Sequence, residues 1–255
     1  MDLGIAGKVA VVCASSKGLG RAAAGALAAE GARLAICARG EAALRAAAEA
    51  IGGDVFWRAL DVRDPDATRR FVADVAERFG AVHILVNNCG GPPMGPTLDF
   101  DDDAWREAID TSFLSAVRWT REAVPHMKRQ KWGRIVNIVS ISVKQPIPNL
   151  VLSNAARSGL VGFAKTLSRE LAPFNVLVNN VLPGTHLTDR IMDLAAGSGE
   201  TPETFAERYG RDIPVGRIGR PEEFGPLVAF LASERAAYIC GASVPIDGGA
   251  YAGML

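Results

Sequence analysis

A glycine-containing loop near the start of the chain has the residue types of a phosphate-binding turn. An apolar run over residues 8–13 leads into Cys-Ala-Ser-Ser-Lys-Gly-Leu-Gly over 13–20, and an alanine-rich helical pattern follows at once. Gly18 and Gly20 allow the backbone to approach a diphosphate, and the following helix offers unpaired N–H groups and the positive end of its dipole. This order predicts nucleotide binding; the alternative is a tight turn that holds no ligand. The predicted loop contacts come from Ala14, Ser15, Lys17, Gly18, Leu19 and Gly20.

The loop needs a scaffold, and the pattern along the chain predicts one. Short apolar runs lie at residues 8–13, 33–38, 54–60, 84–87, 134–140, 176–182 and 243–246. Most are continuous in Val, Ile and Leu, which is typical of parallel strands buried on both faces. Helical patterns lie between them at 20–30, 41–51, 66–79, 101–127, 155–171 and 221–232. The alternation predicts one α/β domain over 1–255, a Rossmann-type doubly wound fold with a mostly parallel sheet of about seven strands and helices on both faces.

One stretch, residues 187–212, fits neither pattern. It follows the sixth apolar run and contains Gly197-Ser198-Gly199 and Pro202. We predict a mobile flap of one or two short helices near the carboxyl edge of the sheet, where α/β proteins bind their ligands.

Charge and composition exclude several classes of protein. The 255 residues include 28 Lys and Arg against 28 Asp and Glu, so the broad positive charge of a nucleic-acid binder is missing. The apolar runs are far shorter than the roughly 18 residues of a membrane span, and the first residues lack the basic group of a signal peptide. Four cysteines without a C-x-x-C pair favour a reduced cytoplasm over a zinc or disulfide scaffold. The acidic run at 99–103 is predicted to cap a helix rather than to bind a metal.

Further motifs are spread from end to end of the chain. They are the turn Asp61-Val62, the turn Asn87-Asn88-Cys89-Gly90, the loop Pro183-Gly184 with Thr188, the segment 217–223 and Asp247-Gly248-Gly249. With the glycine loop, they resemble the short-chain dehydrogenase/reductase family, nearest to members that resemble 3-oxoacyl-[acyl-carrier-protein] reductases. The resemblance implies nicotinamide-cofactor contacts from Asp61, Val62, Asn88, Gly90, Pro183, Gly184 and Thr188. Ala14 stands where the family has glycine, and a positive φ there would strain an alanine.

The charges near the second predicted strand favour NADP(H) over NAD(H). An NAD site usually places a carboxylate on the ribose diol at the end of that strand, and here the position is Ala38. Arg39 follows directly, Lys17 lies in the glycine loop, and the Ser15 hydroxyl is nearby, a set that suits a phosphate dianion. NAD(H) stays possible, and the alternative for both cations is a solvated surface position.

The resemblance also implies an active site of Asn, Ser, Tyr and Lys, and this sequence departs from it. Ser140 stands where the family has its serine. The tyrosine position, thirteen residues on, is Ser153; the lysine position, four further, is Arg157; the helical asparagine position is Ser112. A serine hydroxyl is a much weaker acid than a phenol, and a guanidinium is effectively never deprotonated. An enzyme with this site would have altered proton chemistry, with Ser140 and Ser153 orienting the substrate oxygen and Arg157 bonding ribose hydroxyls.

Two other side chains are candidates for the proton step. Lys144 lies four residues after Ser140, and desolvation or the charge of Arg157 would lower its pKa toward a useful range. His186 lies two residues past Gly184, and its ordinary pKa suits acid–base work. The alternatives are a surface lysine and a loop histidine at the pocket rim.

Two functions follow from these residues. The first is an NADP(H)-dependent oxidoreductase that transfers a hydride between nicotinamide and a small-molecule carbonyl or alcohol. The second is a catalytically impaired nucleotide-binding protein that acts as a regulatory or partner subunit. In either case the resemblance implies a homotetramer or homodimer, built on the two long helices and the last strand, with no nucleic-acid or membrane partner.

Overall fold

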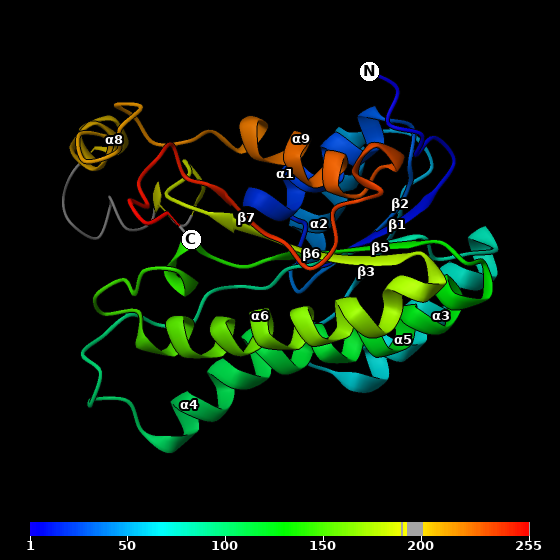
Figure 1. Cartoon of the computed structure of the whole chain (residues 1–255), viewed down its shortest axis with the longest axis horizontal. Coiled ribbons are helices and arrows are strands. Elements are labelled where there is room, and N and C mark those ends of the chain that lie inside the picture. The colour runs from blue at the N-terminus through cyan, green and yellow to red at the C-terminus, as the bar shows by residue number, and fades with distance from the viewer. Residues whose placement is uncertain (190, 193–200, 255) are drawn as a thin grey trace.

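The computed structural model describes residues 1–189, 191–192 and 201–254, and its centre is a seven-stranded sheet (Figure 1). The strands are β1 (Val9–Val12), β2 (Arg33–Ala38), β3 (Phe56–Ala59), β4 (Ile84–Asn87), β5 (Gly133–Ile138), β6 (Val176–Pro183) and β7 (Ser243–Ile246). Their order is β3-β2-β1-β4-β5-β6-β7, and every neighbouring pair is parallel. The predicted doubly wound α/β fold is therefore confirmed. The order reverses between β1 and β4, which places a ligand crevice at their carboxyl ends.

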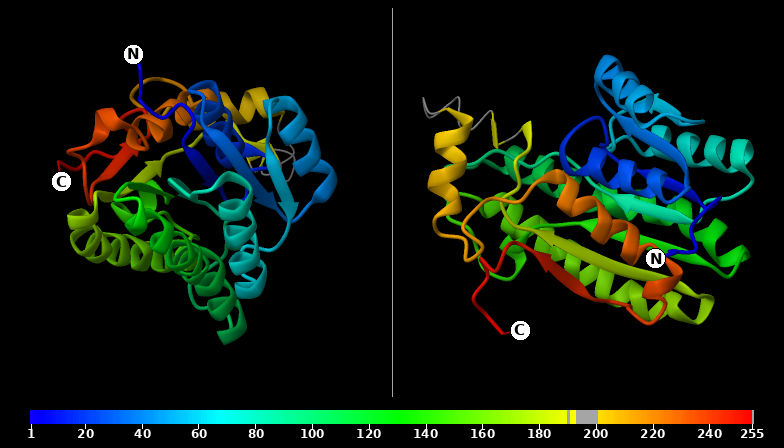
Figure 2. Two further views of the ribbon diagram at one scale, coloured as in Figure 1. Left: turned by 90° about the vertical axis from the view of Figure 1, so that its right-hand side faces the viewer. Right: turned by 90° about the horizontal axis from the view of Figure 1, so that it is seen from above.

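Helices cover both faces of the sheet, as Figures 1 and 2 show. One face carries α1 (Gly18–Ala29), α2 (Glu41–Ile51) and α9 (Pro221–Leu231), and the other carries α3 (Pro65–Phe79), α5 (Ser115–Arg129) and α6 (Val151–Leu171). Each layer buries its own apolar cluster against the strands, because alternate residues of every strand point to opposite faces. Short turns of 3₁₀ helix lie at Ile141–Val143, Ala172–Phe174 and Glu234–Ala236.

The long helix predicted over 101–127 is confirmed, because the helical run is unbroken from Asp102 to Arg129, but it is not regular throughout. The segment contains α4 (Asp102–Ile109), a π-helical turn (Asp110–Leu114) and then α5. The Ser115 hydroxyl donates to the Thr111 carbonyl oxygen at 2.5 Å, a bond that competes with the regular helix ladder and favours a bend. The predicted cap is confirmed, because the Asp101 carboxylate accepts from the backbone N–H of Ala104 at 2.8 Å. The π turn buries Ser112 at the carboxyl edge of the sheet.

The segment after β6 is only partly described. Of the predicted flap, residues 190 and 193–200 lie outside the described residues. The described part ends in α8 (Pro202–Gly210), where the Thr201 hydroxyl caps the helix by accepting from the Thr204 N–H at 3.3 Å. Among the described residues, no helix is long and apolar enough to cross a membrane.

A row of buried amides crosses the sheet below its carboxyl edge. Asn87, Asn137, Asn180 and Ser243 occupy matched positions on β4, β5, β6 and β7. The Asn87 amide donates to Asn137 at 2.8 Å, Asn137 donates to Asn180 at 2.8 Å, and Asn180 donates to the Ser243 hydroxyl at 3.0 Å. The strands that lead to the ligand crevice are thus joined by side chains as well as by their backbones.

Candidate functional site

The glycine loop is shaped by close backbone packing. Ala14 adopts φ +48°, so the strain predicted for an alanine at this position is present. Its carbonyl oxygen accepts from the Asn88 side chain at 3.1 Å. A Cβ at Gly20 would lie 2.5 Å from that oxygen and 2.6 Å from Asn88 Nδ2, so only glycine fits there. The loop, the start of α1 and the end of β4 are therefore held together by one compact contact.

The first turn of α1 leaves its N–H groups available to a ligand. Lys17 occupies the N-cap position without a side-chain cap, and the first turn holds no acidic residue. Unpaired N–H groups and the positive dipole end make such a terminus an anion site. Thr188 lies beside this turn, because a Cβ on Gly18 would come within 3.7 Å of its methyl group. The structure therefore brings together the predicted residues of the glycine loop, Asn88 and the loop after β6.

The structure corrects the expectation for Ser15. Its side chain is fully buried, and its hydroxyl donates to the Val12 carbonyl oxygen at 2.9 Å, so it does not face a phosphate. Its backbone N–H donates to the Cys37 carbonyl oxygen at 3.0 Å, which fixes it inside the loop. Ser16 is partly exposed and is the accessible hydroxyl of the loop. Ser16 was not predicted, and the only signal in the sequence is the adjacent serine pair.

The two cations predicted to bind a phosphate, Lys17 and Arg39, are both exposed. Lys17 Nζ lies 3.7 Å from Asp189 Oδ2, and both side chains are more than half exposed. Arg39 is exposed directly after β2, whose last residue, Ala38, is buried. Surface ion pairs of this kind are weak, so Lys17 is free to exchange Asp189 for a phosphate.

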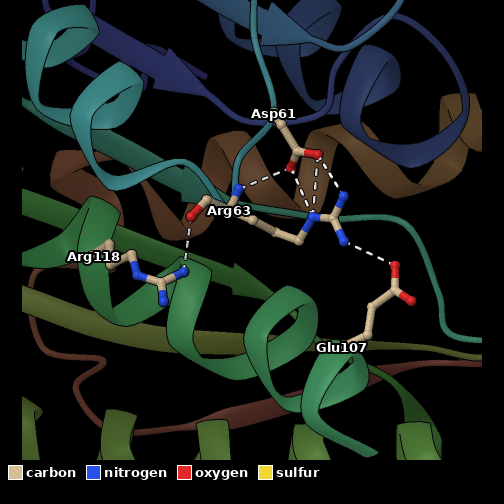
Figure 3. Close-up of polar contacts among 4 residues, drawn as sticks. All are labelled: Asp61, Arg63, Glu107 and Arg118. Carbon is tan, nitrogen blue, oxygen red and sulfur yellow. Dashed lines mark hydrogen bonds and ion pairs between the residues drawn. The ribbon is translucent and has the colours of Figure 1, made fainter. Parts of the chain in front are cut away.

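The acidic turn after β3 is held by arginine. Arg63 donates through Nε and Nη2 to the carboxylate of Asp61, at 2.7 Å for the shortest contact, and its backbone N–H adds a bond of 2.9 Å (Figure 3). The hydrogen bond from Arg63 lowers the pKa of Asp61, and the charge of Arg39 contributes in the same direction. The carboxylate is therefore ionised and fixed in place. Val62, the next predicted contact, is buried, and its carbonyl oxygen accepts from the Trp119 indole at 3.2 Å.

The same arginine connects this turn to the π-helical segment. Arg63 Nη1 donates to Glu107 on α4 at 2.8 Å (Figure 3). Arg118 on α5 donates to the Arg63 carbonyl oxygen at 2.9 Å and to Asp110 at 2.6 Å. The turn after β3 and the helical segment that carries Ser112 are thus linked by hydrogen bonds of charged side chains.

The predicted catalytic residues begin where β5 ends. Ser140 caps a 3₁₀ turn, because its hydroxyl oxygen accepts from the Ser142 N–H at 3.1 Å. The Ser142 hydroxyl is buried, with no hydrogen-bond partner among the described residues. Both side chains come from the loop that follows β5, at the carboxyl edge of the sheet, where α/β proteins bind their ligands.

Ser153 and Arg157 form a buried pair on α6. Arg157 Nε donates to the Ser153 hydroxyl oxygen at 3.2 Å, and both residues are 7 % exposed. Arg157 Nη1 donates to the carbonyl oxygens of Ile138 and Val139 at 3.1 and 2.9 Å. These bonds turn the guanidinium toward the end of β5 and use the donors that were expected to bind ribose hydroxyls. The structure thus corrects the orientation expected for Arg157.

A small cavity lies next to this pair. Its volume is about 10 Å³, and its walls include Asn88, Cys89, Ser112 and Arg157. Cys89 Sγ lies 4.0 Å from Arg157 Nη2 and 3.9 Å from the Ser112 hydroxyl. The position that is asparagine in the resembling family is therefore adjacent to the Ser153–Arg157 pair.

The two candidates for a replacement acid are not brought to Ser153 by any contact among the described residues. Lys144 Nζ lies over the ring of Tyr251, 5.4 Å from its centroid. His186 is buried against Phe224 with the rings edge to face at 5.6 Å, and a Cβ on Gly219 would lie 2.7 Å from its ring. Burial lowers the pKa of His186, which keeps the ring neutral. The expectation that His186 faces the substrate disagrees with this enclosure.

The remaining predicted contacts line the same edge. Pro183 is buried at the end of β6, and a Cβ on Gly184 would lie 2.7 Å from Asp247 Cβ, so glycine is needed where the two loops meet. Gly90 is exposed after β4. Among the described residues, no group of acidic, histidine and cysteine side chains forms a metal site.

The residues present fit a dinucleotide. The uncapped start of α1, the glycine cradle against Asn88 and the cations at 17 and 39 supply donors for a diphosphate and a further phosphate. Fold and loop together define a doubly wound α/β protein with the loop geometry of dinucleotide-binding domains.

Comparisons with known proteins agree with this class. The family described as "Enoyl-(Acyl carrier protein) reductase" matches residues 13–251, so the chain belongs to this family of short-chain dehydrogenases/reductases. A monensin polyketide synthase putative ketoacyl reductase of Streptomyces virginiae is 36% identical over 251 residues, 95% of this chain and 96% of that protein. The 3-oxoacyl-[acyl-carrier-protein] reductase FabG of Escherichia coli K12 is 34% identical over 96% of this chain and 98% of its own. The structure of L-sorbose reductase from Gluconobacter frateurii, complexed with NADPH and L-sorbose, matches with a TM-score of 0.94 at 33% identity over 100% of both chains.

Proposed function

We propose that this chain is an NADP(H)-dependent oxidoreductase that transfers a hydride between nicotinamide and a carbonyl or alcohol substrate, with an active site that lacks the family's Tyr-x-x-x-Lys pair. The observation that carries the proposal is the intact cradle of Ala14, Gly20 and Asn88 beside the serine at the end of β5. The named relatives are reductases, and the sorbose reductase holds NADPH, which supports the cofactor assignment.

When bound, the nicotinamide supplies or accepts the hydride. The chain's own residues then have defined tasks. The start of α1 and the glycine loop hold the diphosphate, and Lys17 and Arg39 neutralise the 2′-phosphate, with no carboxylate at Ala38 to repel it. Ser140 and Ser153 orient the substrate oxygen, and Arg157 polarises Ser153. General acid–base catalysis is worth about 10²–10⁴ in rate, so its absence slows hydride transfer without preventing it.

A calorimetric titration with NADPH, run beside NADH, tests the cofactor assignment. We expect clear binding of NADPH and little of NADH. A screen for NADPH oxidation with a panel of carbonyl compounds then tests the activity. Equal affinities would overturn the preference, and binding of neither nucleotide would overturn the oxidoreductase proposal.

One observation favours the second function, a nucleotide-binding regulatory or partner subunit without turnover. The donors of Arg157 are directed to the carbonyl oxygens of Ile138 and Val139 instead of toward a cofactor ribose. Tight NADPH binding with no oxidation by any member of the carbonyl panel would support this alternative.

We also propose a homotetramer or homodimer that uses α4, α5, α6 and the edge strand β7. The edge strand is half-buried in one chain, and an open edge is a site where a second copy can pair. Sedimentation of a monomer alone at micromolar concentration would contradict this assembly.

A further inference from the structure

Arg157 is a buried cation without a carboxylate partner among the described residues. Arg157 is 7 % exposed, and its hydrogen bonds run to two backbone carbonyl oxygens, to the hydroxyl oxygen of Ser153 and to Cys89 Sγ at 4.0 Å. Buried charges in proteins are usually paired with an opposite charge, because desolvation costs several kcal/mol per ion. Here neutral dipoles replace the counter-ion, so a net positive potential remains at the end of β5.

That potential acts on the neighbouring hydroxyl. The Nε–H of Arg157 occupies an acceptor position on Ser153, and among the described residues the Ser153 hydroxyl makes no other hydrogen bond. The hydroxyl proton of Ser153 is therefore available to donate a hydrogen bond to a substrate. The adjacent positive charge makes the hydroxyl a stronger donor. The Ser140 hydroxyl oxygen likewise accepts one hydrogen bond, but from the neutral backbone N–H of Ser142. Arg157 bonds the carbonyl oxygen of Val139, the residue before Ser140.

We propose that Ser153 and Arg157 are an oxyanion-stabilising pair, and that the substrate is for this reason an electron-poor carbonyl whose reduced oxygen is a weak base. A ketone flanked by a second electron-withdrawing group belongs to this class, and a simple alkyl or aryl ketone does not. The inference rests on the proposed function and narrows its substrate.

The chemistry balances without an acid on the protein. The substrate carbon gains a C–H bond from the reduced nicotinamide, which is oxidised to NADP⁺, and the C=O π pair moves onto oxygen. The hydroxyls of Ser140 and Ser153 donate hydrogen bonds to that oxygen, and water supplies the proton as the product leaves. Arginine does not titrate in the working range, and serine is too weak an acid to transfer its own proton. The product oxygen must therefore remain an anion until water protonates it. A weakly basic oxyanion is stable enough for this, which is why we infer an electron-poor carbonyl substrate.

The first test uses two ketones of the same shape, 2,2,2-trifluoroacetophenone and acetophenone, with NADPH. We expect reduction of the trifluoro ketone with a kcat/KM at least about 10²-fold above that of acetophenone, the size of an effect that stabilises one developing oxyanion. We also expect kcat/KM to be level between about pH 6 and 9, because no catalytic group titrates there. Comparable rates on the two ketones, or an ionisation in the profile, would overturn the proposal.

Variants separate this role from a structural one. Ser153→Ala should lower kcat for the trifluoro ketone about 10²-fold, with NADPH affinity unchanged. Ser158→Ala is the matched control, because Ser158 lies on the same helix, is exposed and bonds only the Asn154 carbonyl oxygen. Arg157→Lys keeps a positive charge but loses the planar set of N–H donors that bond Ser153 and the carbonyl oxygens at once. It should lower kcat more than it raises KM. Retained activity in Ser153→Ala would overturn the pair.

Calorimetry with NADPH separates failure of the proposed function from failure of the oxyanion-stabilising pair. Failure of the wild-type protein to bind NADPH overturns the proposed function and this inference together. Binding of NADPH with equal reduction of both ketones overturns the inference alone and leaves the oxidoreductase in place.

Discussion

The two ends of the ligand crevice are shaped by different parts of the chain, one by backbone and the other by side chains. At the cofactor end, the geometry comes from backbone: a left-handed residue at Ala14, a glycine at Gly20 that admits no Cβ, and the free N–H groups of α1. At the proposed catalytic end it comes from buried side chains, chiefly Arg157 and Ser153. Backbone geometry is set by a few glycines and tolerates other changes nearby. Side-chain geometry can be rebuilt by two substitutions, so one end keeps a general role while the other changes its chemistry.

The largest expected effect belongs to the cofactor end. Gly20→Ala would place a methyl group 2.5 Å from the Ala14 oxygen, and relief of that overlap should cost about 1–3 kcal/mol and weaken NADPH binding by about 10- to 100-fold. Gly25→Ala is the control on the same helix, because a Cβ there meets nothing within 4 Å. It should leave affinity unchanged and raise stability by up to about 1 kcal/mol. Titration calorimetry measures the NADPH affinity of the two variants, and urea unfolding measures their stability. Equal effects of Gly20→Ala and Gly25→Ala would contradict the special role of Gly20.

Charge at the cofactor end should have the next largest effect. Removal of both cations in Lys17→Ala with Arg39→Ala should weaken NADPH binding by about tenfold or more, since hydrogen bonds to charged groups contribute about 1.5–3 kcal/mol. NADH binding should hardly change, because it has no 2′-phosphate. A parallel loss for both nucleotides, measured by calorimetry, would show that these cations do not select the cofactor.

A smaller effect is expected from relief of strain in the loop. Ala14→Gly removes the Cβ from a residue at φ +48°, which should relieve about 1–2 kcal/mol of left-handed strain in the folded protein. The added flexibility of glycine in the unfolded chain opposes part of this gain. We expect higher stability, tighter NADPH binding and no change in substrate preference. A shift in the ratio of rates on the two ketones would show that the two ends are coupled through this loop.

The smallest effect concerns pH. Burial lowers the pKa of His186 in the folded protein, so the unfolded chain binds its proton more readily. The stability that this histidine contributes is present above its unfolded pKa of about 6.5 and is lost as pH falls through its lower folded value. Urea unfolding at successive pH values should show this decline in the wild type and a weaker one in His186→Gln. The kcat profile should be the same in both, and a lost ionisation in the variant would restore His186 as the acid.

The sequence predicted the backbone of the site better than its side chains. The positions of the strands and the glycine loop follow from apolar runs and glycine spacing, and the strain considered at Ala14 is present as φ +48°. The inward turn of Arg157 depends on carbonyl oxygens of another element, such as Val139. The Ser15 hydroxyl turns to the carbonyl oxygen of Val12, only three residues earlier, and the residue type alone does not show that orientation. The π-helical turn at 110–114 was missed because such turns are rare and occur as single turns inside α-helices, so a helical pattern predicts regular α-helix.

The row of amides from Asn87 to Ser243 has a consequence for how the sheet assembles. Because side chains alternate between faces, a strand paired one residue out of step would turn its amide into the opposite apolar layer, where residues such as Val86 and Val136 belong. A buried amide without a hydrogen-bond partner costs about 1–3 kcal/mol. Misalignment of one strand removes the partner of its own amide and also that of the amide on the neighbouring strand. The row therefore favours the native alignment of these strands, and with it the mutual positions of the loops that hold Cys89 and Ser140.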